Sequence, residues 1–348
     1  MIKRNKKTWI VKEADLDDFD AIRRLFRVVW GYQRPLEYDK WKYLKFVEGV
    51  SQISVAKVND EIVSAFMLAP MTLSIGAEIV PGGVAMDVMS HPEYVGTTSF
   101  IEVGKHCVIK AQERGLRVLY GFPNTHSFPS FVKRLNWDHS GNINHWVRPI
   151  KPSIYSKVPL ILGPAADLAF YLLPTGKIGD LTIKVSNYSE KEILQLLKGQ
   201  KKFAKKCGIY HNENWYFSRY VGESRSSYEW VYAYQGGKVV ACGVWGMRDK
   251  SWGGGFTARA QITELFGNEV LALSGILSTI IKRARKKDAM LLETVTNDPR
   301  LEKVLKRCSF YKHNQIPLIV KNIGKEELSA NIHHHPNWTI FGGDVDTF

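Results

Sequence analysis

The chain has 348 residues, of which 45% are hydrophobic and 24% charged, and its formal net charge is +14. This composition is typical of a globular protein with a full core, and the length argues against a single domain. The positive charge suits an anionic partner, such as a phosphorylated cofactor, nucleic acid or a membrane surface.

Cysteine usage and hydropathy narrow the class of protein further. The four cysteines lie far apart without a CxxC pair, so we expect a cytoplasmic protein with neither a disulfide framework nor a zinc site. The first charged residues lead into no apolar run, so no signal peptide is expected. Residues 158–173 are the most apolar segment, but proline, glycine and aspartate break it and no membrane span is expected. A segment that lies on a membrane surface stays open.

The first 150 residues predict an alternation of strands and helices. A strand at 8–12 precedes a helix that begins near Asp15 and ends at Val29. An aromatic-rich helix follows at 39–47, and then a hairpin that turns at Asn59-Asp60. The later predicted elements are strands at 70–79, 84–89, 117–122 and 143–147, and helices at 99–115 and 129–135.

The stretch from Met86 to Gly115 combines a strand, a polar turn and an amphipathic helix. Pro92 ends the strand, and the residues around Gly96 have turn chemistry. A strand that passes into a helix through such a turn presents backbone N–H groups at the positive end of the helix dipole, which favours phosphate binding. Ser99 and Glu102 also fit a capping box, which would occupy some of these groups.

The second half of the chain repeats this order of elements. The aromatic run at Trp41 recurs at Trp215, an offset of 215 − 41 = 174, and Asn124 recurs as Asn297, an offset of 297 − 124 = 173. Near-constant offsets predict two copies of one domain. The predicted division is a first domain at 1–150, a linker rich in proline and glycine at 151–181, a second domain at 182–324 and a tail at 325–348.

The turn before the helix differs between the two copies. In the second copy it carries one glycine, Gly267, and two carboxylates, Glu264 and Glu269, which would repel a pyrophosphate. Any phosphorylated cofactor is therefore expected in the first copy.

The first copy resembles the GNAT superfamily of acyl-CoA-dependent N-acyltransferases. The resemblance rests on the strand, residues 91–100, the next helix and strand, Asn124, and Leu135-Asn136-Trp137. It covers about residues 8–150 and, more weakly, 182–322. It implies an α/β fold of two tandem domains, each with a mixed, mostly antiparallel central sheet flanked by helices. Fem-type aminoacyltransferases and GNAT-like proteins of bacterial surface-polysaccharide synthesis are similar tandem proteins, and residues 338–347 resemble a tail of the latter group.

The turn departs from the family motif Arg/Gln-x-x-Gly-x-Gly/Ala. Glu93, Val95 and Thr98 replace motif residues, and Gly96 is retained. A main-chain contact to the pyrophosphate survives such changes. The acyl-CoA-binding residues that the resemblance implies are Met89, Val95, Gly96, Thr97, Thr98, Ser99, Phe100, Asn124 and Ser127.

Acyl transfer from a thioester to an amine needs a base for the ammonium proton and a donor to the oxyanion. Asp87, on the strand beside the expected acyl site, and His91, at the end of that strand, are the candidate catalytic residues, although each also fits a structural role. The tyrosine that often serves as acid in the family is absent, because Phe131 lies near its place.

Three other motifs give weaker indications of function. The rings of Trp41, Tyr43 and Trp215 could line a substrate cleft for the acceptor, or pack between the domains. The histidine run 333–335 is typical of a solvated tail and no metal site is expected, while glycines 253–255 indicate a loop.

The sequence therefore predicts an N-acyltransferase that moves an acetyl or other acyl group from acyl-CoA to an amine acceptor. An amino sugar of a surface polysaccharide precursor is one such acceptor. The alternatives are a Fem-like aminoacyltransferase that uses charged tRNA and a non-catalytic binding protein with the GNAT fold. Nucleic acid is not expected outside the tRNA alternative.

Overall fold

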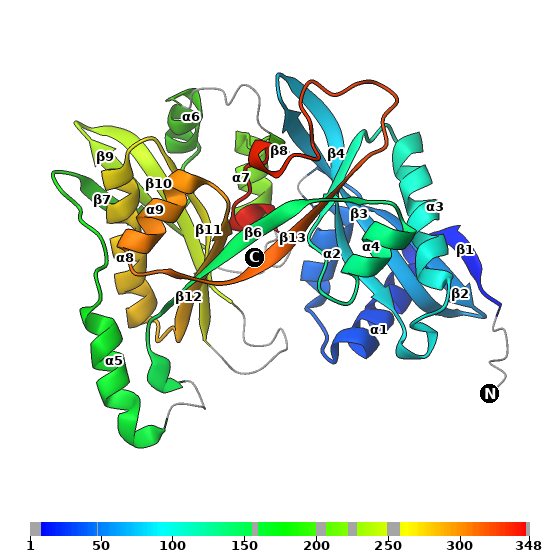
Figure 1. Cartoon of the computed structure of the whole chain (residues 1–348), viewed down its shortest axis with the longest axis horizontal. Helices are drawn as coiled ribbons and strands as arrows, with labels where there is room; N and C mark the ends of the chain where they lie inside the picture. Colours follow the sequence, from blue (N-terminus) through cyan, green and yellow to red (C-terminus); the bar gives the residue numbers. More distant parts are fainter. Residues whose placement is uncertain are drawn as a thin grey trace. The chain divides into compact units, whose positions relative to one another are not determined.

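The computed structural model describes residues 8–46, 48–154, 159–199, 207–221, 228–248 and 258–345. The chain divides into two compact units (Figure 1). Unit 1 contains Met1–Gly141 and Pro317–His334, and unit 2 contains Asn142–Ile316 and His335–Phe348. This division differs from the predicted boundaries at 150 and 324, because residues 142–150 belong to unit 2 and residues 317–324 to unit 1.

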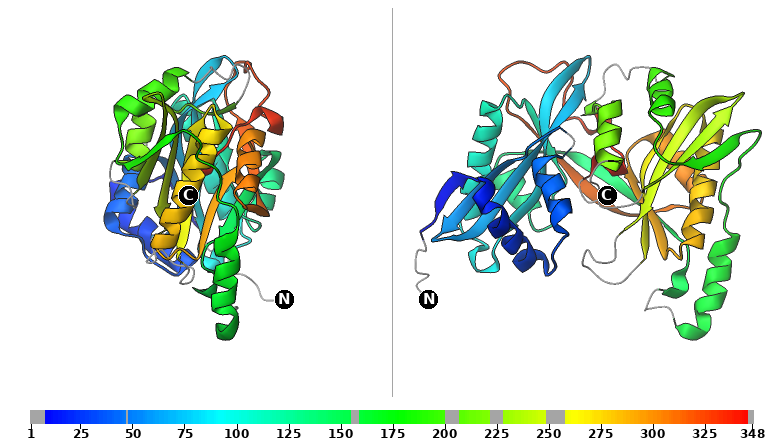
Figure 2. Two further views of the ribbon diagram at one scale, coloured as in Figure 1. Left: turned by 90° about the vertical axis from the view of Figure 1, so that its left-hand side faces the viewer. Right: turned by 180° about the vertical axis from the view of Figure 1, so that it is seen from behind.

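Unit 1 is a sheet with helices on both faces (Figure 2). Its strands, in spatial order, are β1 (Ile10–Glu13), β2 (Gln52–Val58), β3 (Glu61–Ile75), β4 (Glu78–Ser90), β5 (Val118–Gly121) and the end of β13 (Tyr311–Asn322). The β4–β5 pair is parallel and the others are antiparallel. The helices are α1 (Phe19–Trp30) and α2 (Leu36–Leu44) on one face, and α3 (Ser99–Glu113) and α4 (Phe128–Arg134) on the other.

The core of unit 1 explains why these segments fold. β3 is buried along residues 62–69, so it reads as a continuous apolar run rather than an alternating one. Phe66 and Leu68 pack with Val103 and Cys107 of α3 and with Phe131 of α4. Helix α3 ends at Glu113, and Gly115, two residues later, has a φ of 84° in the left-handed region that favours glycine.

Unit 2 repeats this architecture. Its strands, in spatial order, are β6 (Asp138–Pro149), β12 (Leu291–Thr296), β11 (Arg259–Gly267), β10 (Lys238–Met247), β9 (Glu229–Gln235) and β7 (Thr182–Ser186). Only the β11–β12 pair among these is parallel. The helices are α5 (Gly163–Leu172), α6 (Glu190–Gly199), α7 (Glu213–Tyr220), α8 (Val270–Lys286) and α9 (Pro299–Arg307), and a short strand, β8, covers Cys207–Ile209.

The predicted repeat and fold class are confirmed. The order β2-β3-β4-α3-β5-α4-β6 recurs as β9-β10-β11-α8-β12-α9-β13. The closing strands are exchanged, because the end of β13 pairs with β5 in unit 1 and β6 pairs with β12 in unit 2.

Several predicted segments fold differently in detail. The aromatic helix spans Leu36–Leu44 rather than 39–47, and the predicted linker contains α5. The glycine loop at 253–255 lies outside the described residues. No helix in the described part of the chain is long and apolar enough to cross a membrane. Within the same residues, no cluster of His, Cys, Asp and Glu is arranged to hold a metal ion.

Candidate active site

A wedge opens between two parallel strands of unit 1. β4 and β5 pair only over Gly82–Ala85 and Val118–Gly121. β4 then continues to Ser90, whereas β5 ends at Gly121. The edge of β4 beyond Ala85 that faces away from β3 therefore has no strand partner among the described residues of unit 1. Backbone groups on such an edge are available to a ligand.

A β-bulge lies at the mouth of this wedge. Met86 and Met89 of β4 oppose Met67 and Ala65 of β3, so β4 carries one extra residue there. Asp87 sits in the bulge with a φ of 45°, a left-handed conformation that aspartate tolerates better than most residues. The bulge turns the Asp87 side chain toward α2.

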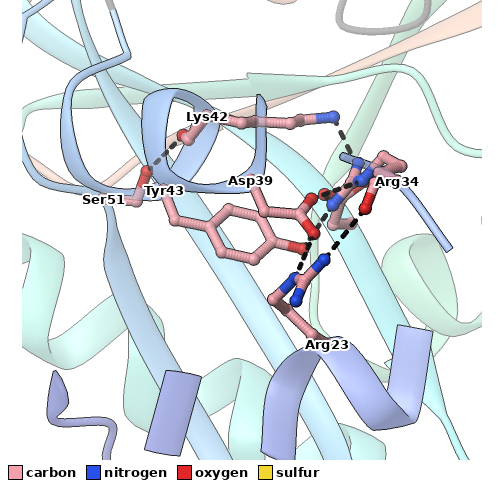
Figure 3. Close-up of polar contacts among 7 residues, drawn as sticks. Arg23, Arg34, Asp39, Lys42, Tyr43 and Ser51 are labelled. Atoms are coloured by element: carbon pink, nitrogen blue, oxygen red, sulfur yellow. Dashed lines mark hydrogen bonds and ion pairs between the residues drawn. The ribbon is translucent and has the colours of Figure 1, made fainter. Parts of the chain in front are cut away.

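The Asp87 carboxylate belongs to a buried cluster of charges. Figure 3 labels the other members of this cluster, which are Arg23, Arg34, Asp39, Lys42 and Tyr43. Arg34 Nη2 lies 2.7 Å from Asp87 Oδ2, and Lys42 Nζ lies 3.2 Å from Asp87 Oδ1. Arg34 Nε donates to Asp39 at 2.7 Å, and Arg23 Nε donates to the other oxygen of Asp39 at 2.7 Å. The side chains of Arg34, Asp39 and Lys42 are at most 4% exposed. Burial of this kind makes each charge depend on its partners.

These ion pairs decide the charge of Asp87. Burial alone would raise the pKa of its carboxyl, but Arg34 and Lys42 outweigh burial and hold the pKa well below the usual range. A carboxylate so stabilised is a weak proton acceptor at neutral pH. The geometry therefore speaks against the predicted role of Asp87 as the base and for a role in fixing the bulge.

Sequence reasoning missed this cluster. Arg34 and Asp87 are 53 positions apart and meet only through the topology. The available signal was weak, because Asp39 and Lys42 are two of four charged residues in the nine-residue helix α2.

The turn between β4 and α3 presents open backbone N–H groups. Gly96, Thr98 and Phe100 donate to no acceptor in the part of the chain that the structure describes, and Gly96 has a φ of 84° with open space on its Cβ side. Val95, Gly96 and Thr98 are exposed. Three N–H groups at the start of a 15-residue helix form an anion-binding arrangement.

The expected capping box does not form. Thr98 is the N-cap of α3 and makes no capping bond. Ser99 is fully buried, and its hydroxyl bonds Ser64 at 2.8 Å and Thr97 at 2.9 Å instead. The side chain of Ser99 is thus closed to a ligand, and the same holds for Met89, which is 1% exposed. Phe100 packs against Phe66 and Phe131, which leaves its N–H as the group open to a cofactor.

The other predicted residues of the first copy lie around the wedge. His91 caps the short 3₁₀ turn at Pro92–Tyr94, because its Nδ1 accepts the N–H of Glu93 at 3.3 Å. Asn124 follows β5, and its Oδ1 accepts the N–H groups of His126 and Ser127 at the start of α4. Among the described residues, the Asn124 side-chain nitrogen has no hydrogen-bond acceptor, so it is available to a ligand.

The three predicted substrate residues are buried. Trp41, Tyr43 and Trp215 are 3%, 0% and 1% exposed. Trp41 packs on Phe46, and the Tyr43 hydroxyl accepts a hydrogen bond from Arg34 within the charge cluster. None of these rings presents a free face for a sugar.

Glu102 is expected to weaken anion binding at the turn. It lies in the first turn of α3, where it accepts hydrogen bonds from Trp9 at 2.8 Å and from Thr98 at 2.5 Å. We predict that Glu102→Gln tightens CoA binding about fivefold, since it removes a like charge near the phosphates, and costs about 0.5 kcal/mol of helix stability. Calorimetric titration and thermal unfolding measure the two effects. Glu113→Gln, at the other end of α3, is the control, and an unchanged affinity in Glu102→Gln would place the phosphates elsewhere.

Unit 2 holds a counterpart of the charge cluster at one constant offset. Arg34, Lys42, Tyr43 and Asp87 become His211, Arg219, Tyr220 and Glu264 when 177 is added to each number. Here the Tyr220 hydroxyl donates to Glu264 at 2.6 Å, and β11 also carries one extra residue beside Glu264.

The wedge of unit 2 is filled by the chain's own C-terminal segment. β11 and β12 pair only over 259–261 and 291–293. Asn297 donates to Trp338 O at 2.8 Å and accepts from Ile340 N at 2.9 Å, and Phe341 bridges to Thr296. Gly343 passes so close to Tyr220 and Glu264 that a Cβ would collide with both. An extended polypeptide thus fits this kind of wedge.

The unit 2 turn is shorter than the turn of unit 1. Only Asn268 and Glu269 separate β11 from α8, whereas residues 91–98 separate β4 from α3. The placement of a phosphorylated cofactor in the first copy stays a prediction.

Part of the sequence matches a known protein family, and the fold is similar to that of several solved structures. Residues 11–140 match a family model described as an acetyltransferase (GNAT) domain. No curated protein matches the sequence. Among solved structures, a probable N-acyltransferase from Enterococcus faecalis V583 is similar at a TM-score of 0.63 and 13% identity, over 91% of this chain and 73% of that chain.

Two further structures are similar over most of the chain. N-myristoyltransferase from Saccharomyces cerevisiae, solved with bound myristoyl-CoA and inhibitors, has a TM-score of 0.66 and 11% identity, over 92% of this chain and 81% of that chain. A tandem GNAT protein from the clavulanic acid biosynthesis pathway has a TM-score of 0.60 and 12% identity, over 92% of this chain and all of that chain. At these identities the likeness shows the tandem fold.

Proposed function

We propose that unit 1, whose residues 11–140 match the GNAT acetyltransferase domain, binds an acyl-CoA and transfers its acyl group to an amine. The observation that carries this proposal is the β4–β5 wedge, which leads to the open N–H groups before α3. A long, extended cofactor with a phosphate at one end needs both features together.

In this proposal the pyrophosphate contacts the N–H groups of Gly96, Thr98 and Phe100. The pantetheine arm lies in the wedge, where the free edge of β4 and the side-chain nitrogen of Asn124 face its amides. The filled wedge of unit 2 supports this placement, because Asn297 pairs there with the backbone amides of an extended segment.

The chemistry forms a C–N bond between the acceptor amine and the thioester carbon, and breaks the C–S bond. Backbone N–H groups on the free edge of β4 stabilise the developing oxyanion. The thiolate is a fair leaving group, so a missing acid is tolerated. Asp87 holds the bulge and its neighbouring N–H groups in position through Arg34 and Lys42.

The acceptor amine is expected to lose its proton to solvent. Both predicted bases are engaged, Asp87 by cations and His91 by the N–H of Glu93. We predict that kcat/KM rises with pH up to the pKa of the acceptor itself and shifts when an acceptor of different pKa is used. A pH profile that keeps one inflection for all acceptors would reveal a base in the protein instead.

Titration with acetyl-CoA and longer acyl-CoAs tests the cofactor, and thiol release with a panel of amines, including amino sugars, tests the acceptor. We expect saturable binding of one CoA per chain. Absence of heat and of thermal shift at millimolar acetyl-CoA would refute the proposal and favour a non-catalytic GNAT-fold protein. The net charge of +14 also keeps charged tRNA as a second donor candidate, which a steep fall in RNA affinity with salt would support.

A further inference from the structure

Helix α5 of unit 2 exposes an apolar surface. Gly163 is the one buried residue of this helix. Five large apolar side chains of α5 and of the preceding 3₁₀ turn are 55–89% exposed; they are Ile161, Leu162, Leu168, Tyr171 and Leu172. In Figures 1 and 2 the green helix stands away from the sheet of unit 2. The contact of these apolar side chains with water is unfavourable in free energy, so burying them against a partner would be stabilising.

Three of these five residues form one stripe together with Ala165. Ile161, Ala165, Leu168 and Leu172 are spaced by four, three and four positions, which places them along one side of the helix. The one carboxylate of α5, Asp167, accepts hydrogen bonds from the backbone and hydroxyl of Ser153. The stripe itself is therefore free of charge.

A basic cluster lies near the C-terminal end of α5. Arg285, near the end of α8, donates to the carbonyls of Phe170 and Tyr171 and lies 4.5 Å from the centre of the Tyr171 ring. Lys282 and Lys286 are exposed on the same turns of α8 and have no ion pair within the described residues. Arg285 thus ties the cationic end of α8 to the C-terminal end of α5.

Two nearby carboxylates are paired with cations, whereas Asp167 of α5 is held by the neutral groups of Ser153. Glu229 pairs with Arg283 and with Lys287, and Asp288 pairs with Lys151 at 2.8 Å. Lys282 and Lys286, which make no ion pair within the described residues, therefore leave positive charge facing solvent on α8.

We propose that α5 and the basic end of α8 dock the protein on the surface of a membrane that contains anionic lipids. An apolar helical stripe that enters the boundary of the acyl chains, bordered by cations at the headgroup level, is the arrangement that such a surface binds. This inference is independent of the proposed acyl transfer, because no residue of unit 1 takes part in it.

Co-sedimentation of the full chain with sucrose-loaded vesicles tests the proposal. We expect binding to vesicles of phosphatidylcholine with 30% phosphatidylglycerol and at least tenfold weaker binding to pure phosphatidylcholine. Raising NaCl from 50 to 500 mM should weaken the binding by a similar factor. Leu168→Gln with Leu172→Gln, and separately Lys282→Gln with Lys286→Gln, should each weaken it about tenfold or more.

Matched control variants distinguish binding through this surface from non-specific binding of the protein to vesicles. Ile109→Gln on α3, where Ile109 is 53% exposed, and Lys303→Gln on α9 should leave vesicle binding within twofold. Far-UV circular dichroism and thermal unfolding verify that each variant folds. Failure to sediment with anionic vesicles, or equal loss in the control variants, would overturn the proposal. A change in molecular mass by light scattering in the Leu168/Leu172 variant, without vesicle binding, would instead assign the stripe to contact between copies.

Discussion

Replacing Asp87 with asparagine is expected to destabilise the chain by about 3–5 kcal/mol, since it leaves the buried cations Arg34 and Lys42 without their shared anion. A loss of this size should lower Tm by roughly 10 °C. Asp60→Asn, at an exposed hairpin turn, serves as the control and should change stability by no more than about 0.5 kcal/mol. Thermal and urea unfolding measure both effects.

A second variant distinguishes the charge from the geometry of the bulge. The double variant Lys42→Met with Asp87→Asn removes one of the two cations together with the Asp87 charge. Its loss of stability should be smaller than the sum of the two single losses by more than about 1 kcal/mol.

Because the pKa of Asp87 is lowered, the contribution of its charge to stability is complete above the pKa of the unfolded carboxyl, near 4, and is lost only as pH falls below that value. Asp87→Asn should therefore leave the pH dependence of stability between 5 and 8 unchanged. An Asp87→Asn cost below about 1 kcal/mol would contradict the role assigned to this cluster.

The stability of unit 2 is expected to fall as pH rises from 5 to 8. Glu264 is buried beside Tyr220, and burial raises its pKa to about 7 against the opposing effect of His211. Between the unfolded pKa of about 4.5 and the folded value the native state holds the extra proton, so stability declines with pH by up to about 3 kcal/mol. His211 acts in the same direction, because Asp344 outweighs burial and raises its pKa, so its contribution is lost as pH rises through the folded value.

Glu264→Gln tests this prediction. Glutamine keeps an acceptor for the Tyr220 hydroxyl but cannot ionise, so the variant should be more stable than the native chain at pH 8 and show a flatter pH dependence. Urea midpoints at several pH values from 5.5 to 8.5 provide the measurement, with Glu190→Gln on the surface of α6 as control. If the stability of Glu264→Gln falls with pH as steeply as that of the native chain, the extra proton of the folded state is bound by another group.

The sequence predicts those parts of the fold that are encoded by hydrophobic periodicity and by the internal repeat. The helix predicted at 99–115 forms as α3 (Ser99–Glu113), and offsets of 173 and 174 correctly imply two copies. The exchange of closing strands could not be predicted, because the alternation within β6 and β13 does not specify which strand each one pairs with. The predicted boundaries at 150 and 324 therefore differ from those of the units.

The candidate site was predictable only in its backbone part. Gly96 and the strand–turn–helix pattern mark the phosphate turn from local signals. The cluster of Arg34, Lys42, Tyr43 and Asp87 depends on contacts between distant segments, and its offset of 177 differs from the 173 and 174 that the aromatic and asparagine matches give. The prediction that Ser99 caps the helix was wrong, because the Ser99 hydroxyl forms a hydrogen bond with Ser64 instead, a residue distant in sequence.

The proposed site for the phosphates of a CoA cosubstrate at Gly96 is tested most directly by comparing two glycines that flank α3. Gly96 and Gly115 have the same φ of 84° and the same open space around a Cβ. Alanine at either position should cost a similar 1–2 kcal/mol of stability.

Calorimetric titration of both variants with CoA is the decisive measurement. Gly96→Ala is expected to raise Kd about tenfold or more by turning N–H groups away from the phosphates, while Gly115→Ala stays within twofold of the native chain. Equal affinities in the two variants, or no binding to the native chain, would contradict the account.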